Sequence, residues 1–177
     1  MRDSRSFDPY ENLLAPAENS VSFSSGNFPA GPDVVNIGQP DGVDVPPFAQ
    51  QDMVPIGEGN EIIAGMVNPI SPDDEDAMAR GEVMYERFCA VCHGSNGVGA
   101  NAYIVQRHPT VAVYNVAGPV VQAYSDQYLY GMIRVGRGLM PEYGSRISHF
   151  DRWKIVNYVR LLQSEFNGVN GQQDGGD

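Results

Sequence analysis

The chain has 177 residues, of which 20 are glycine and 13 are proline, and it carries a formal net charge of −11 at pH 7. A negative charge without a basic stripe argues against a nucleic-acid-binding protein. No stretch approaches the roughly 18–20 consecutive apolar residues that a transmembrane helix needs. The polar start of the chain also lacks the apolar core of a signal peptide.

Composition changes sharply along the chain. Ten of the 13 prolines, 10 of the 22 acidic residues and only 2 of the 11 basic residues lie in residues 1–72. This part shows no sustained apolar period, and its prolines favour turns and extended polyproline-like backbone. We expect an extended acidic arm over 1–72 that binds partners, a compact domain over 73–166 and a flexible acidic tail over 167–177. A disordered arm is the alternative that composition alone favours.

Helix signals begin where the arm ends. Ser71-Pro72-Asp73-Asp74 supplies a serine N-cap, a proline at the first helical position and acidic residues in the first turn. Together with apolar residues at steps of three and four, these signals predict a helix from Asp76 to about Cys92. An irregular loop is predicted after it by three glycines, Gly94, Gly97 and Gly99.

Two further helices follow in the sequence. Ser125 predicts the N-cap of a short helix over Asp126–Val135, which Gly136 ends. Ser148-x-x-Asp151 resembles a capping box and predicts a last helix of roughly 15 residues, fading at Phe166-Asn167-Gly168. No strand-rich region appears, so the expected fold is mainly α.

The most specific motif ends the first predicted helix, in Cys89-Ala90-Val91-Cys92-His93. C-x-x-C-H is the attachment signature of a c-type haem, and here it uses both cysteines of the chain. Two thiols three residues apart on one helical turn can add to the two vinyl groups of one porphyrin. The histidine that follows is then carried under the iron as its proximal ligand. The motif predicts one covalent haem c and an electron carrier rather than an enzyme.

Other uses of paired cysteines fit this motif less well. A zinc site needs four ligands, and outside the motif only His108 and His149 are available as histidines. A thioredoxin-like C-x-x-C follows a strand in a βαβ unit and gives the adjacent histidine no role. A disulfide across two intervening residues would be strained and would close almost no loop. Haem attachment is therefore the preferred interpretation.

A second axial ligand is expected from Met140, in the glycine-rich loop Gly136–Pro141 between two predicted helices. A thioether in this loop can reach back over the porphyrin, and the following proline stiffens the backbone. The other methionines of the compact domain lie on predicted helices and are interpreted as packing. His149 and His108 are the alternative ligands. Ligation by His93 and Met140 would raise the reduction potential relative to two histidines and leave no open site for oxygen chemistry.

Four further residues are candidates for the surroundings of the haem. The free ring nitrogen of the proximal histidine should donate to a backbone carbonyl, which we expect at Pro109. Arg107 is expected either to pair with a haem propionate or to be an ordinary surface arginine. Tyr143 and Trp153 are expected either to line the pocket or simply to pack in the core.

Three arginines flank the predicted ligand loop in the sequence: Arg134, Arg137 and Arg146. They are expected either to surround an exposed haem edge and steer an acidic partner, or to be solvated surface residues. The haem itself is expected to supply apolar surface that so small a domain lacks. The domain without haem should therefore be poorly folded, as small metal-dependent domains are.

Residues 75–164 resemble class I cytochromes c. Gly81-x-x-x-Tyr85-x-x-x-Cys89 is similar to the N-terminal helix of that family, in which a glycine permits close approach of the C-terminal helix. Ile155 and Tyr158 match the pair that packs against it. A narrower resemblance, to the monohaem cytochrome c subunit of alternative complex III, is carried by Gly99–Arg107, Met140–Ile147 and Asp151–Val156.

The resemblance implies a class I cytochrome c fold in a subunit of a membrane-associated, quinol-oxidising respiratory or photosynthetic complex. Such a subunit relays electrons from a neighbouring multihaem cytochrome to a soluble or oxidase-bound acceptor, at the periplasmic or extracytoplasmic face of the cell membrane. It also implies a long N-terminal region laid over partner subunits. Many members carry a lipidated N-terminal cysteine, which this sequence lacks. Since c-type haem is attached outside the cytoplasm, we expect the chain to start near a processed end.

Three other functions remain open on the sequence alone. The first is a free or differently attached class I cytochrome c that serves an oxidase or a reaction centre. The second is a small-ligand sensor or haem enzyme with an open sixth position on the iron. In the third, the arm staples subunits together and the haem is secondary.

Overall fold

The structure is a computed structural model that describes residues 66–111 and 113–171. Most of the expected arm, and the tail from residue 172, lie outside the described residues. The described part is mainly helical, as predicted, and its only β-pairing is an isolated bridge between Arg137 and Met140. The helices are α2 (Glu75–Phe88), α3 (Ala90–His93), α4 (Tyr103–Arg107), α5 (Pro119–Gln122), α6 (Asp126–Val135) and α7 (His149–Gly171).

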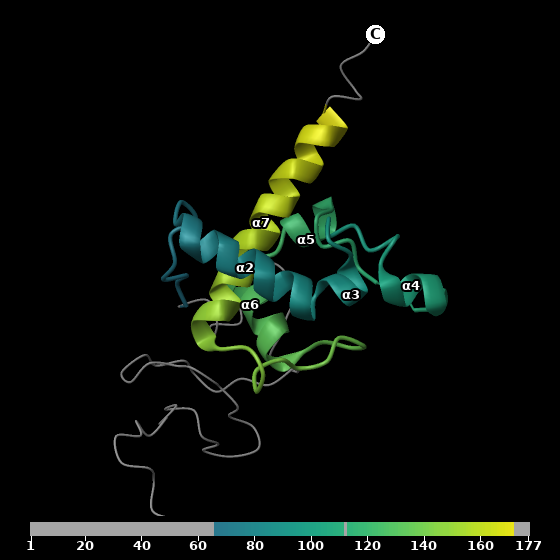
Figure 1. Cartoon of the computed structure of the whole chain (residues 1–177), viewed down its shortest axis with the longest axis horizontal. Helices are drawn as coiled ribbons and strands as arrows, with labels where there is room; N and C mark the ends of the chain where they lie inside the picture. Colours follow the sequence, from purple (N-terminus) through teal and green to yellow (C-terminus); the bar gives the residue numbers. More distant parts are fainter. Residues whose placement is uncertain (1–65, 112, 172–177) are drawn as a thin grey trace, which may run out of the picture.

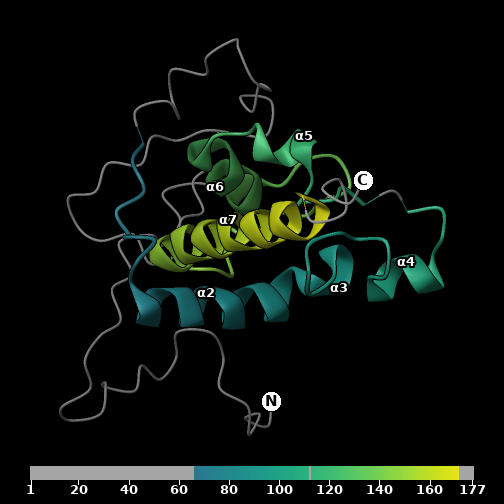
Figure 2. The same cartoon turned by 90° about the horizontal axis from the view of Figure 1, so that it is seen from above.

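Helix α7 lies at the centre of the fold, between α2 on one side and α6 on the other (Figure 2). At the α2–α7 crossing, a Cβ placed on Gly81 would lie only 2.3 Å from the backbone oxygen of Lys154. The rings of Tyr85 and Tyr158 meet beside it, with centroids 5.3 Å apart. Glycine at position 81 therefore allows the close approach that was predicted, and Ile155 is 1% exposed in the same core.

The helix starts were only partly predicted. Asp74, not Ser71, is the N-cap of α2, because its carboxylate accepts a hydrogen bond of 2.9 Å from the amide of Ala77. The Ser71 hydroxyl instead accepts from the Asp73 amide and closes the preceding turn. The bounds of α6 and the Ser125 cap, which accepts from the Tyr128 amide, are as predicted.

Helix α7 is longer than expected, with 23 residues, and Figure 1 shows its C-terminal turns projecting beyond the rest of the fold. Its start agrees with the prediction in part, since the Ser148 hydroxyl accepts from the Asp151 amide at 3.2 Å. Asn167, where the helix was expected to fade, exchanges two side-chain hydrogen bonds of 3.0 and 3.2 Å with Gln122. These bonds hold the extension of α7 against α5. None of the described helices is both long and apolar enough to cross a bilayer.

The segment before α2 is fastened to the helical core. The Gln127 side chain donates to the Met66 carbonyl at 2.7 Å, and Met66 is 9% exposed. Asn157, on α7, accepts from the Asn68 side chain at 2.7 Å and donates to the Ile70 carbonyl at 3.2 Å. Packing of the compact domain thus begins at least as early as residue 66, within the range assigned to the arm.

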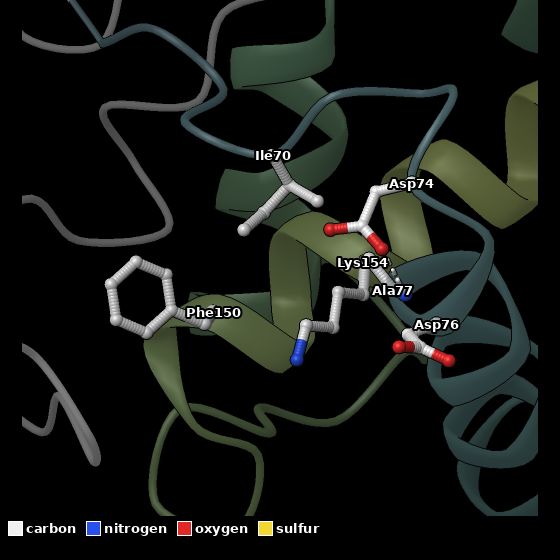
Figure 3. Close-up of a pocket in the computed structure, with 6 residues that line it drawn as sticks. All are labelled: Ile70, Asp74, Asp76, Ala77, Phe150 and Lys154. Carbon is white, nitrogen blue, oxygen red and sulfur yellow. Dashed lines mark hydrogen bonds between the residues drawn. The ribbon is translucent and has the colours of Figure 1, made fainter.

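An open pocket of about 400 Å³ lies where this segment meets α2 and α7 (Figure 3). None of the predicted site residues lines it. It is bordered by Ile70, Asp74, Asp76, Ala77, Phe150 and Lys154.

Candidate functional site

The Cys-x-x-Cys-His motif occupies one short turn at the end of α2. Cys89 ends α2 and caps α3, while Cys92 and His93 lie within the four residues of α3. The amides of Cys92 and His93 both donate to the Cys89 carbonyl, at 3.0 and 2.9 Å. Neither cysteine forms a disulfide. The turn therefore presents two free thiols and an imidazole from adjacent positions of one backbone unit.

Within the described residues, the surroundings of the motif offer a bare metal ion too few ligands. Burial raises the pKa of Cys89 to about 12, with smaller contributions from nearby Cys92 and Glu86. Among the described residues, no group of three or more histidine, cysteine and acidic side chains is placed to hold a metal ion. The donor set fits a porphyrin that brings its own metal.

The imidazole of His93 is fixed through one of its nitrogens. Nδ1 lies 3.1 Å from the carbonyl oxygen of Tyr114, so it carries the proton and donates. Burial lowers the pKa of His93, while the Tyr114 carbonyl raises it; burial is the larger effect and keeps the ring neutral. Since Nδ1 is engaged, Nε2 is the nitrogen left to bind a metal.

The backbone carbonyl that accepts from His93 was expected at Pro109, but in the structure it belongs to Tyr114. Pro109 follows α4 and is exposed, while the chain returns to the histidine five residues later. The contact is made by a backbone oxygen, so no side-chain pattern marked Tyr114 as the partner.

Met140 lies in a tight turn that follows α6. Its amide donates to the Arg137 carbonyl at 2.9 Å, and the Arg137 amide donates to the Met140 carbonyl at 3.0 Å. The half-buried Met140 side chain packs against the same core cluster as Cys89. Tyr143 meets Phe88 edge-to-face, with ring centroids 6.1 Å apart, and its pKa is raised by burial and then by both motif cysteines. The loop predicted to supply the second ligand therefore lies close to the motif.

The two alternative histidines differ in their surroundings. His108 is exposed at the end of α4. His149 is 3% exposed, and its Nδ1 lies 2.8 Å from the Tyr130 hydroxyl, which also accepts a 3.0 Å bond from Arg152. The Tyr130 hydroxyl can accept from Arg152 and donate to Nδ1 of a neutral His149 at the same time. His149 is thus already engaged in a core hydrogen bond.

The remaining candidates take different positions in the structure. Arg107 is exposed, with its guanidinium 4.0 Å from the centroid of the Tyr103 ring. Trp153 is 1% exposed and stacks on Tyr130 at 4.4 Å, which is core packing between α6 and α7. Arg134 is only 3% exposed, so the expectation that it lies at the surface is wrong. Burial lowers the pKa of Arg134 to about 10. It lies four residues after Tyr130 on α6 and so shares that buried face.

The buried histidine predicts a pH dependence of stability. Burial, followed by the charges of Arg152 and Arg134, lowers the pKa of His149 from 6.5 to about 4. The unfolded chain therefore takes up this proton first, and stability should fall by about 3 kcal/mol as pH drops from 6.5 to 4. Urea unfolding of the purified protein between pH 7 and pH 4 measures this loss. His149→Gln keeps an acceptor for Tyr130 but cannot titrate, so a slope as steep as that of the wild type would contradict the assignment.

Helices packed beside a Cys-x-x-Cys-His turn are the arrangement expected of a class I c-type cytochrome domain. Residues 76–159 match the family model described as cytochrome c oxidase, cbb3-type, subunit III. No curated protein matches the chain. A cytochrome c domain carries covalently bound haem c and is typical of electron-transfer proteins rather than of enzymes.

Proposed function

We propose that the protein is an electron-transfer cytochrome c with one haem, which Cys89 and Cys92 would hold through thioether bonds and whose iron His93 and Met140 would bind. The observation that carries this proposal is the α3 turn. It presents two free thiols and a neutral imidazole whose Nδ1 is already bound by the Tyr114 carbonyl. Bound haem supplies one-electron exchange between ferric and ferrous iron.

Each residue has a distinct part in this arrangement. The two thiols anchor the group to the end of α2, so that it cannot dissociate. The Tyr114 carbonyl fixes the orientation of the His93 ring and raises its basicity as a ligand. The backbone-bonded turn of Arg137 and Met140 holds the thioether on a short, rigid segment. The domain has no reacting substrate to bind, and its task is to hold one redox group in fixed geometry.

Loss of the thioether should open the sixth position on the iron. Wild-type protein should keep its pigment in acidic acetone, show the weak far-red sulfur-to-iron band when oxidised, and bind carbon monoxide poorly when reduced. Met140→Ala should keep the pigment, lose the band and bind carbon monoxide readily, as absorption spectra would show. Met132→Ala, which removes a half-buried methionine from α6, is the matched control. Ready binding of carbon monoxide by the wild type would rule out Met140 as ligand.

The wider setting we propose is a membrane-associated, quinol-oxidising complex of the alternative complex III type. The chain would take electrons from a multihaem cytochrome subunit and pass them to a periplasmic or other extracytoplasmic acceptor. The support is the resemblance of Met140–Ile147 and Asp151–Val156 to the monohaem subunit of that complex, together with a proline-rich acidic segment long enough to span partner subunits. Purification from membranes, followed by identification of the co-purifying chains, tests this setting.

A second candidate is an electron carrier attached to a terminal oxidase. It is favoured by the match of residues 76–159 to the model of a cbb3-type oxidase subunit. The same purification separates the two candidates. Co-purification with a multihaem cytochrome and a quinol-oxidising core supports the first, while co-purification with a haem–copper oxidase core supports the second.

Charge on the ligand loop should affect the rate at which electrons reach an acidic acceptor. Arg137 is half-buried against the Tyr128 ring, and Arg146 is exposed. Arg137→Glu should slow second-order electron transfer by about two- to tenfold at low salt, and Arg137→Gln by less, because electrostatic steering scales with charge. The difference should vanish at high ionic strength. Stopped-flow rates that are equal at all salt concentrations would remove the steering role.

A further inference from the structure

We propose that Tyr85 is a positioning residue for His93, and that it acts through its hydroxyl group rather than through its ring alone. Its hydroxyl donates a 2.9 Å hydrogen bond to the carbonyl of Gly94, the residue directly after the histidine. This inference rests on the proposed function, in which His93 is the proximal ligand. It assigns to one side chain of α2 the task of holding the backbone that carries that ligand.

Tyr85 bonds to the residue at each end of the Cys89–Gly94 stretch. Its backbone carbonyl accepts from the Cys89 amide at 2.7 Å, as the last turn of α2 requires. Its hydroxyl reaches Gly94 at the other end. Two oxygen atoms of Tyr85 thus accept from one end of the attachment turn and donate to the other. The two ends are therefore held at a fixed separation.

Gly94 is a sensitive point in this turn. Its φ of +73° lies in the left-handed region, where the chain leaves α3 and reverses into the glycine-rich loop. Its carbonyl also accepts from the Gly97 amide at 3.1 Å, and its own amide donates to Ala90 at 2.8 Å. The Tyr85 hydroxyl therefore strengthens a loop closure on which the backbone after His93 depends.

Tyr85 is itself closely packed, as a positioning group must be. It is 1% exposed, and its ring packs on Tyr158 at the crossing where Gly81 brings α2 and α7 together. The hydrogen bond from Tyr85 to Gly94 is independent of the Tyr114 carbonyl, which restrains the imidazole ring rather than the backbone. The histidine is thus held twice, from two separate parts of the chain.

Packing alone does not account for the hydroxyl at position 85. A phenylalanine would fill the same space against Tyr158 but would leave the Gly94 carbonyl with the Gly97 amide as its only bond among those described. Tyr158 offers an internal comparison, since it belongs to the same ring pair and its hydroxyl forms none of the hydrogen bonds described for the turn. Tyr85→Phe and Tyr158→Phe therefore remove the same group from the same pair, with only one of them at the ligand turn.

The test compares these two variants in the haem-loaded full chain. Tyr85→Phe should speed exchange of the Gly97 amide by about five- to tenfold, the loss expected for one neutral hydrogen bond. It should also shift the midpoint potential and the hyperfine-shifted His93 resonances in the ferric NMR spectrum. Tyr158→Phe should change none of the three. Equal shifts in both variants, or no shift in Tyr85→Phe, would overturn the proposal.

Failure of the proposed function would look different from failure of this inference. Absence of covalent pigment in the wild-type protein contradicts the haem site itself, and it is established before any variant is compared. The exchange rate of the Gly97 amide reports on the hydrogen bonds to the Gly94 carbonyl and does not depend on a signal from the iron. Unchanged Gly97 exchange in Tyr85→Phe, with pigment attached, would sink the positioning role alone.

Discussion

Gly136→Ala is expected to displace Met140 and to destabilise the protein by about 2–4 kcal/mol. Gly136 ends α6 with φ +72° and ψ 177°, a conformation that is essentially restricted to glycine and that costs other residues about 1–3 kcal/mol. A Cβ there would also lie 2.5 Å from the Met140 carbonyl oxygen and 2.8 Å from the Pro141 carbonyl carbon. Both are backbone atoms, so the clash cannot be relieved by a side-chain rotation. The turn that carries Met140 must move instead.

Gly138→Ala is the matched control for this prediction. Gly138 also has a positive φ, +58°, but a Cβ there would meet nothing within 4 Å. It should therefore cost only the backbone strain, about 1 kcal/mol, and keep the far-red band. Urea unfolding and the oxidised absorption spectrum measure both effects. If the two variants lose the same stability and both keep the band, Gly136 does not position the thioether.

Gly81→Ala is expected to destabilise the protein strongly, although it leaves the predicted haem-binding residues untouched. The added methyl group would have to occupy space 2.3 Å from the Lys154 carbonyl oxygen and 3.3 Å from the Tyr158 Cβ. Forcing an atom into such a contact separates the helices and costs typically 1–3 kcal/mol or more. A loss of about 3 kcal/mol would lower Tm by about 10 °C or more in a domain of this size.

A glycine-to-alanine substitution in the exposed part of α7 should instead increase stability. A Cβ on Gly168 would meet nothing within 4 Å. Gly168→Ala should therefore stabilise the helix by up to about 1 kcal/mol, because alanine loses less backbone freedom on folding. Thermal unfolding followed by circular dichroism compares the two variants. Equal Tm values would mean that the α2–α7 crossing is more tolerant than its contacts indicate.

Local signals predicted the elements that depend on local chemistry. Ser125 and Gly136 give the bounds of α6 because both act within one turn of the helix ends. The start of α2 was harder, because Ser71 and Asp74 are both good N-caps three residues apart. Only the structure shows that the Asp74 carboxylate, and not the Ser71 hydroxyl, meets the first turn.

Contacts between residues far apart in the sequence could not be predicted from local sequence patterns. Beyond the expected end of α7, Asn167 bonds to Gln122, which lies 45 residues away in the sequence. The Tyr114 contact to His93 is made by a main-chain oxygen, which carries no sequence signature. Burial of Arg134 was foreseeable in principle, since it follows Tyr130 by four residues on one helix face.

The fastening of the Met66–Ile70 segment has a mechanical consequence. Any tension that reaches the domain along the preceding chain meets Gln127 on α6 and Asn157 on α7 before it arrives at α2. The load is therefore taken up by two helices that do not carry the Cys-x-x-Cys-His turn. A pull on residue 66 would thus be borne by α6 and α7 before it reached the Cys-x-x-Cys-His turn.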